Sequence, residues 1–147
     1  MNAERLRPLE AALGHHFVEA PLVTRALTHA SYAHEHPPDS DQEPLAFLGD
    51  AAVALVVAER LFACAPAAPV GVLTPERAAL VSGANLARWA STLELGSLVR
   101  LGRGEELSGG RERESILATT LEAVLGVVYL EGGLTAVREA VGRLAGW

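Results

Sequence analysis

Two long apolar segments, each interrupted by a single carboxylate, constrain the fold of this chain more than any other feature. Asp50 is the only charged residue within residues 44–58, and Glu122 is the only one within residues 116–130. Apolar runs of this length are too long for strands and therefore predict helices. Because a helix that is apolar on almost all sides is buried, we expect each of these helices to carry its acid into or beside the core.

A carboxylate in such a place needs a partner. Burying it alone costs several kcal/mol or more, so it must be paired, protonated or bound to a cation. Neither segment contains an arginine, and two acids on two central helices indicate that they meet. A divalent metal with oxygen ligands is one interpretation. The alternative is that each acid caps a backbone amide or pairs with an arginine from elsewhere, such as Arg77 or Arg111.

The remaining segments also predict helices, and none predicts a strand. The helices are expected at residues 4–13, 21–36, 43–63, 76–93, 111–133 and 134–146. Pro37 and Pro38 end the second of them, and the APAAPVG stretch of residues 65–71 interrupts the chain after the third. With 147 residues, half of them hydrophobic, we expect a single all-α domain over residues 1–147.

The charge of the chain limits its partners. The formal net charge is −6, and every basic residue is an arginine. Phosphate contacts supply most non-specific affinity for nucleic acids, so RNA binding would need a local arginine patch or metal ions. A single cysteine, Cys64, excludes an internal disulfide and fits a reducing compartment. We find no signal-peptide core and no uninterrupted membrane-length run, and we expect a cytoplasmic protein without a membrane partner.

Four motifs follow one another along residues 5–145. They are LTHASY (27–32), EPLAFLGDAAV (43–53), LTPERAALVS (73–82) and LGRGEELSGGRERESILATTLEAVLGVVYLEGG (101–133). The second resembles the nine-residue signature of the ribonuclease III family, and the other three have that family's order and spacing. The resemblance implies an all-α, ribonuclease III endonuclease-domain-like helical bundle.

Members of this family act as homodimers that cut double-stranded RNA with Mg²⁺, leaving 5′-phosphate and 3′-hydroxyl ends. The resemblance therefore implies structured or double-stranded RNA as a partner, a homodimer, and Mg²⁺ (or Mn²⁺) as cofactor. The family's commoner form continues into a double-stranded-RNA-binding domain. Since this sequence ends at Trp147, we expect it to lack that domain.

Four carboxylates from two helices form the family's active site, in pairs four and three residues apart, so that each pair shares one helical face. The corresponding positions here are Ala46, Asp50, Thr119 and Glu122. Asp50 and Glu122 match and are the implied metal ligands, whereas Ala46 and Thr119 are degenerate catalytic positions. Glu43 matches the first acid of the signature and is a third catalytic candidate. It lies two turns from Asp50, about 10 Å along the axis, too far to replace the missing ligand.

The glycine-rich stretch before the last apolar segment is the candidate RNA-binding region. Arg103, Arg111, Arg113 and Ser108 are the predicted contacts, since backbone amides near a helix start can bind phosphate. The alternative is a solvated loop whose arginines pair with neighbouring acids. Those acids are Glu105, Glu106, Glu112 and Glu114.

Phe47 also lies in the signature segment, between Ala46 and Asp50. By resemblance it inserts across the dimer interface; the alternative is an ordinary core aromatic. Three functions follow from the degenerate site. The chain is an endonuclease domain with weak metal binding and impaired activity, or a catalytically inactive pseudonuclease that binds RNA or a ribonucleoprotein, or a regulatory partner that dimerises with an active relative.

Overall fold

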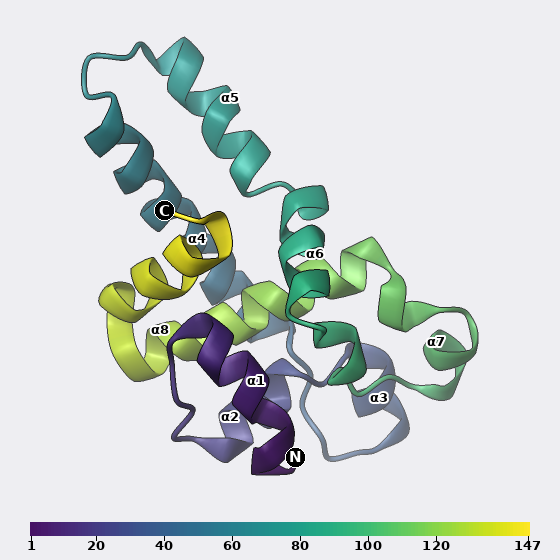
Figure 1. Cartoon of the computed structure of the whole chain (residues 1–147). Helices are drawn as coiled ribbons and strands as arrows, with labels where there is room; N and C mark the ends of the chain where they lie inside the picture. The colour runs from purple at the N-terminus through teal and green to yellow at the C-terminus, as the bar shows by residue number, and fades with distance from the viewer.

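The computed structural model describes all 147 residues and consists of helices joined by short loops (Figure 1). The elements are α1 (Ala3–Leu13), α2 (Ala20–Ala26), α3 (Ala30–Glu35), α4 (Glu43–Cys64), α5 (Val70–Leu80), α6 (Gly83–Thr92), η1 (Leu95–Ser97), α7 (Arg103–Leu107), η2 (Gly110–Glu112) and α8 (Glu114–Ala145). The chain forms no strand, and only one isolated bridge, between Thr28 and Arg100, has β geometry. The predicted all-α class is confirmed.

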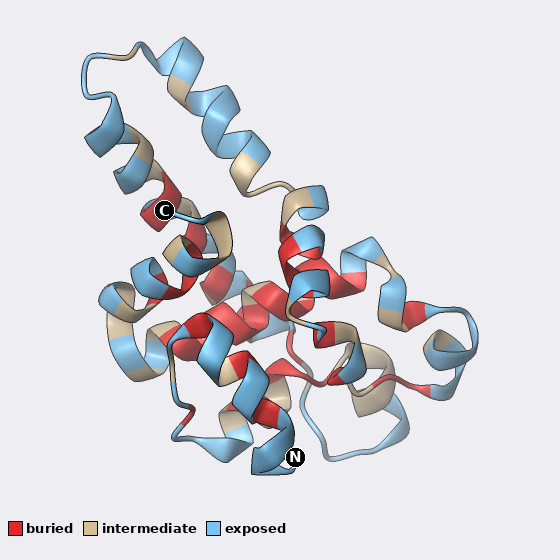
Figure 2. Cartoon of the chain, in the orientation of Figure 1, coloured by how far each residue is buried: buried red, intermediate tan, exposed pale blue.

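Helix α8 runs through the centre of the molecule, and α1, α2, α4 and α6 pack against it (Figure 1). Its middle turns are buried on nearly every side (Figure 2), and Leu121, Ala123 and Val127, which face different directions around the helix, are fully buried. Removing these side chains from water is the main force that assembles the bundle. By length and composition α8 could also cross a membrane, but 61% of its most apolar stretch is buried inside the protein, as in a core helix.

A sharp bend divides α8 into two helical parts. Gly133 has φ 66° and ψ −168°, a conformation that side chains with a Cβ rarely adopt. The predicted helix end at Glu131–Gly133 and the separate last helix are therefore confirmed as a kink. Just before it, the Glu131 carboxylate accepts hydrogen bonds from the backbone N–H groups of Val18 and Glu19, which ties the start of α2 to α8.

The α4–α5 hairpin projects from the body of the protein (Figures 1 and 2). No residue of α5 is buried, and the second half of α4 leaves Leu55 and Phe62 exposed. The expectation that α4 is buried on all sides is therefore wrong. One side of α4 packs on α8, and its other side is apolar but open.

Two predicted helices are each divided in the structure. Residues 21–36 form two helices, α2 and α3, because the backbone between them makes hydrogen bonds outside the helix. The Thr28 carbonyl accepts from the Gln42 N–H, and the His29 N–H donates to the Arg100 carbonyl. Residues 76–93 divide at Ser82, whose side chain caps α6. Helix α5 begins at Val70, so Pro75 lies inside it and the predicted helix start at residue 76 is wrong.

Candidate active site

Two glycines let α4 and α8 cross at very short distance. A Cβ at Gly49 would overlap the carbonyl oxygen of Glu122, and a Cβ at Gly126 would overlap that of Leu45. The backbones are therefore in direct contact, and no larger residue fits without moving a helix. The crossing places Asp50, the residue after Gly49, beside Glu122.

Asp50 and Glu122 meet at this crossing. Asp50 is exposed and Glu122 half-buried. Partial burial, followed by the charge and the hydrogen bond of Asp50, raises the pKa of Glu122 to about 7. The structure thus brings together the two acids that the sequence placed on separate apolar helices.

No arginine neutralises this pair. Neither Asp50 nor Glu122 takes part in an ion pair, and the two arginines considered as partners lie elsewhere. Arg111 pairs with Glu106, at 2.6 Å between Nη2 and Oε2, and Arg77 lines a recess between α4 and α5. The pairing alternative is therefore not found in the structure, and the two carboxylates remain available to a cation.

The two degenerate positions lie on the same helical faces as the acids. Ala46 is buried one turn before Asp50, and Thr119 is half-buried three residues before Glu122, with no side-chain hydrogen bond. No group of three or more His, Cys, Asp or Glu side chains that could hold an ion is present. Two carboxylates suit one Mg²⁺, which is often held by one or two carboxylates and completed by water and phosphate. They do not suit a second ion.

Glu43 stands apart from the acid pair. It is exposed in the first turn of α4, where its backbone N–H donates to the Asp41 side chain at 2.9 Å. It lies seven residues before Asp50 in α4, about 10 Å along the helix axis, which is too far for the two carboxylates to hold the same ion directly.

Comparison with known proteins identifies the family. The family model described as Ribonuclease-III-like matches residues 19–145. The chain belongs to this family. It is 52% identical over 136 residues to Ribonuclease 3 of Streptomyces coelicolor, covering 92% of this chain and 49% of that protein. It is 46% identical over 134 residues to Ribonuclease 3 of Caldanaerobacter subterraneus, covering 90% and 59%. The chain thus spans about half the length of these curated relatives.

The solved structures agree with the family assignment. The nuclease domain of ribonuclease III from Campylobacter jejuni superimposes with a TM-score of 0.88 at 37% identity, covering 95% of this chain and 94% of that one. That structure is described as showing flexibility in a region involved in dimer formation. The fold of this chain is therefore that of a ribonuclease III nuclease domain.

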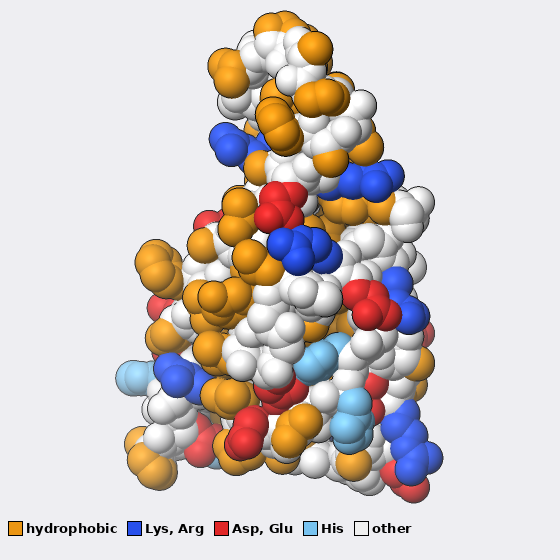
Figure 3. Space-filling model, turned by 90° about the vertical axis from the view of Figure 1, so that its left-hand side faces the viewer, with side chains coloured by type: hydrophobic (Ala, Val, Ile, Leu, Met, Phe, Trp, Pro, Cys, Tyr) orange, Lys and Arg blue, Asp and Glu red, His pale blue; other side chains and the backbone are white.

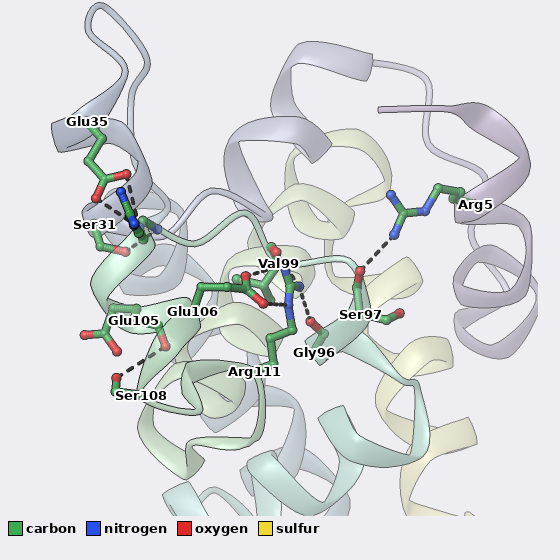
Figure 4. A network of polar contacts seen from close by, with 12 residues as sticks. Arg5, Ser31, Glu35, Gly96, Ser97, Val99, Glu105, Glu106, Ser108 and Arg111 are labelled. Carbon is green, nitrogen blue, oxygen red and sulfur yellow. Dashed lines mark hydrogen bonds and ion pairs between the residues drawn. The ribbon is translucent and has the colours of Figure 1, made fainter.

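Two of the arginines predicted to contact RNA are occupied by internal contacts. The Arg111 guanidinium donates to Glu106 and to the carbonyls of Gly96 and Val99 (Figure 4). Arg113 pairs with Glu105. The alternative of pairing with neighbouring acids is thus confirmed for Arg111 and Arg113, and both stabilise the loop.

Arg103 and Ser108 are placed differently from these two arginines. Ser108 is exposed, and its hydroxyl accepts from Arg113 at 3.1 Å, so its polar atoms also serve the loop. The exposed Arg103 makes no side-chain hydrogen bond, and only its backbone N–H is bonded, to Glu35. Among the predicted RNA contacts of this ribonuclease III domain, Arg103 has the free guanidinium.

Phe47 is not a core aromatic of the single chain. Its side chain is 82% exposed, and Leu55 and Phe62 continue an apolar stripe along the same side of α4. Hydrophobic side chains gather on the projecting hairpin and on the surface below it (Figure 3). Large exposed apolar patches on otherwise folded domains mark interaction sites.

Sequence reasoning missed the two glycines that build the site. Gly49 and Gly126 stand inside long apolar helices, where a glycine costs up to about 1 kcal/mol relative to alanine. Each lies within four residues of one of the acids. A glycine inside a long helical segment can mark the close approach of another backbone, and this was the available signal.

The partial burial of Glu122, together with the nearby charge of Asp50, makes folding stability depend on pH. The pKa of Glu122 is raised in the folded state, which therefore binds more protons than the unfolded chain between about pH 4.5 and 7. The free energy of unfolding should fall as the pH rises through this window. Glu122→Gln should then stabilise the protein by about 1 kcal/mol at pH 8, a value discounted for solvent exposure, and have little effect at pH 4.5.

Urea unfolding at both pH values measures this effect. Glu112→Gln, at an exposed position on η2, is the control and should change stability equally little at either pH. A Glu122→Gln variant that is destabilised at pH 8 would contradict the expected repulsion between the acids.

Proposed function

We propose that this chain is an endoribonuclease domain that acts on double-stranded or structured RNA as a homodimer, with one Mg²⁺ or Mn²⁺ held by Asp50 and Glu122, and that it cleaves slowly. The observation that carries the proposal is the convergence of these two acids at the crossing of α4 and α8 without an arginine partner. The relatives named Ribonuclease 3 support the reaction class.

Each residue has a defined part in this proposal. Asp50 and Glu122 present carboxylate oxygens, the ligands that hard divalent ions prefer. An ion bound there supplies an activated water and charge neutralisation for phosphodiester hydrolysis. The Gly49–Gly126 contact keeps the two carboxylates together, and the exposure of Asp50 leaves one side open for an RNA phosphate.

Slow cleavage follows from Ala46 and Thr119. An alanine offers no ligand atom, and a threonine offers only a neutral hydroxyl. Removing a metal ligand or a charge stabiliser commonly lowers the rate by a factor on the order of 10². Two such losses leave a low rate and weak metal binding. RNA affinity would depend on the dimer groove and on Arg103, since the chain is acidic overall.

A homodimer would cover the apolar stripe of α4. Phe47→Asp places a charge in the most exposed part of that stripe, so we expect it to convert the parent dimer to a monomer of 15.4 kDa. Light scattering after gel filtration measures the mass. Leu107→Asp is the matched control, since Leu107 is 78% exposed on α7, away from α4. A parent that is already monomeric, or a control that dissociates equally, would contradict this interface.

The absence of a third acid favours a second candidate, an inactive pseudonuclease that binds RNA or a ribonucleoprotein. It shares the fold and the dimer surface but not the reaction. The same experiment separates the two functions.

The test is to incubate the purified protein with double-stranded RNA and Mg²⁺ or Mn²⁺, beside Asp50→Asn/Glu122→Gln. We expect slow cleavage by the parent and none by the variant, which keeps the shape of both side chains. RNA that is bound but not cut by either protein supports the pseudonuclease. RNA that is neither bound nor cut overturns both.

A further inference from the structure

Three polar side chains are buried almost completely, and hydrogen bonds connect the residues that carry them. They are Thr28, Gln42 and Thr120, each at most 1% exposed. They come from the turn between α2 and α3, the residue before α4 and the middle of α8. The other buried side chains of this core are hydrophobic. A connected group of three buried polar residues therefore requires an explanation.

Hydrogen bonds join the three residues. Gln42 donates its backbone N–H to the carbonyl of Thr28 at 2.9 Å. The Thr120 hydroxyl lies 2.7 Å from the carbonyl of Ile116 and 3.2 Å from the Gln42 side-chain Oε1, so its single proton is shared between these two acceptors. Gln42 thus bonds to α8 through its side chain and to the α2–α3 turn through its backbone.

The cluster is a second connection between the two helices that carry the acids. Gln42 precedes the first turn of α4, about two turns before Asp50, and Thr120 is two residues before Glu122. The glycine contact fixes how closely the helices approach. A hydrogen bond on one side of the crossing also fixes their rotation and register, because it has direction and a steric contact does not.

Stability alone does not account for Gln42. Only one of the two polar atoms of its buried side-chain amide has a hydrogen-bond partner, and a leucine of similar size would leave no polar atom of its own unsatisfied. The position therefore holds an amide with only half of its hydrogen bonds made, although an apolar side chain there would give the protein at least the same stability.

We infer that Gln42 is a positioning residue, which holds the start of α4 in register with α8 so that Asp50 and Glu122 meet. The inference rests on the proposed function in so far as the two acids hold a metal. It concerns the placement of the acids and not the reaction itself.

The first experiment measures the affinity for Mn²⁺ by electron paramagnetic resonance and the free energy of unfolding of the same variants in urea. Gln42→Leu should keep or raise the free energy of unfolding and yet weaken Mn²⁺ binding by about tenfold or more. Thr120→Val should weaken it similarly, and the double variant should add little, because both changes break the same bond. Trp89→Phe is the matched control: it removes the other buried unpartnered nitrogen, on α6, and should leave Mn²⁺ binding unchanged.

The second measurement does not need a metal. In a Cys64→Ser background, Asp50→Cys/Glu122→Cys puts two thiols at the crossing, and a short bifunctional thiol reagent should join them in high yield. Adding Gln42→Leu should lower that yield, whereas adding Trp89→Phe should not.

The outcomes separate the inference from the function on which it rests. A parent that binds no Mn²⁺ while Gln42→Leu still lowers the cross-linking yield overturns the metal site and supports the positioning role. An unchanged cross-linking yield, with unchanged Mn²⁺ affinity in the Leu variant, overturns the inference. Loss of Mn²⁺ affinity only in proportion to lost stability, equally in the Trp89→Phe control, overturns it as well.

Discussion

Ala46→Glu/Thr119→Asp should raise the rate of double-stranded RNA cleavage by about 10²-fold or more. Both positions share a helical face with an acid that is already in place, one turn before Asp50 and three residues before Glu122. Four carboxylates could hold a second ion, which two cannot. Because Ala46 is buried, the variant should also be less stable than the parent without metal and regain stability when Mg²⁺ is added.

The measurement is single-turnover cleavage of a labelled RNA duplex at fixed salt. Ala63→Glu/Ser115→Asp is the control, since it adds the same charges to exposed positions of α4 and α8 and should leave the rate unchanged. Equal cleavage rates for the parent and the Ala46/Thr119 variant would show that acids at these two positions do not contribute to catalysis in this chain. A variant that binds metal but does not cut would place the defect in RNA binding.

The helices that carry the site could be predicted because their signals are long and local. Asp50 and Glu122 each stand alone in an apolar run, and the energetic penalty on burying an unpaired carboxylate indicated that the two acids meet, although only Glu122 is partly buried and Asp50 is exposed. The prediction of burial failed for α4 because apolar composition does not distinguish a core from an unpartnered surface. Phe47 is 82% exposed in the single chain, yet the sequence around it has the same apolar composition as that of a buried core helix.

What could not be predicted depends on contacts between distant residues. The break between α2 and α3 exists because Thr28 and His29 bond to Gln42 and Arg100. No local sequence pattern predicts those partners, and the helical spacing of apolar residues continues across the break. The same holds for Arg111, since its carbonyl partners Gly96 and Val99 come from another turn of the chain and only the fold brings them within reach.

The crossing glycine allows a direct test of how the site is built. Gly49→Ala should lower the free energy of unfolding by about 3 kcal/mol or more, because the new methyl group would overlap the backbone carbonyl of Glu122. A side chain could move aside, but a backbone carbonyl inside α8 cannot do so without shifting the helix. Gly126 on α8 makes the matching close contact with the Leu45 carbonyl of α4. A shift of α8 that relieved the first overlap would therefore disturb this second contact.

The sign of the effect is decisive, because alanine is the better helix former by about 0.8–1 kcal/mol. Gly142→Ala, at a position on α8 where nothing lies near the added methyl group, should therefore stabilise the protein. Urea unfolding of both variants compares the two directly. If Gly49→Ala were also stabilising, α4 and α8 would not be in backbone contact, and the meeting of Asp50 with Glu122 would lose its structural cause. If it destabilises while Gly142→Ala does not, the packing that makes the crossing tight is also what holds the two acids together.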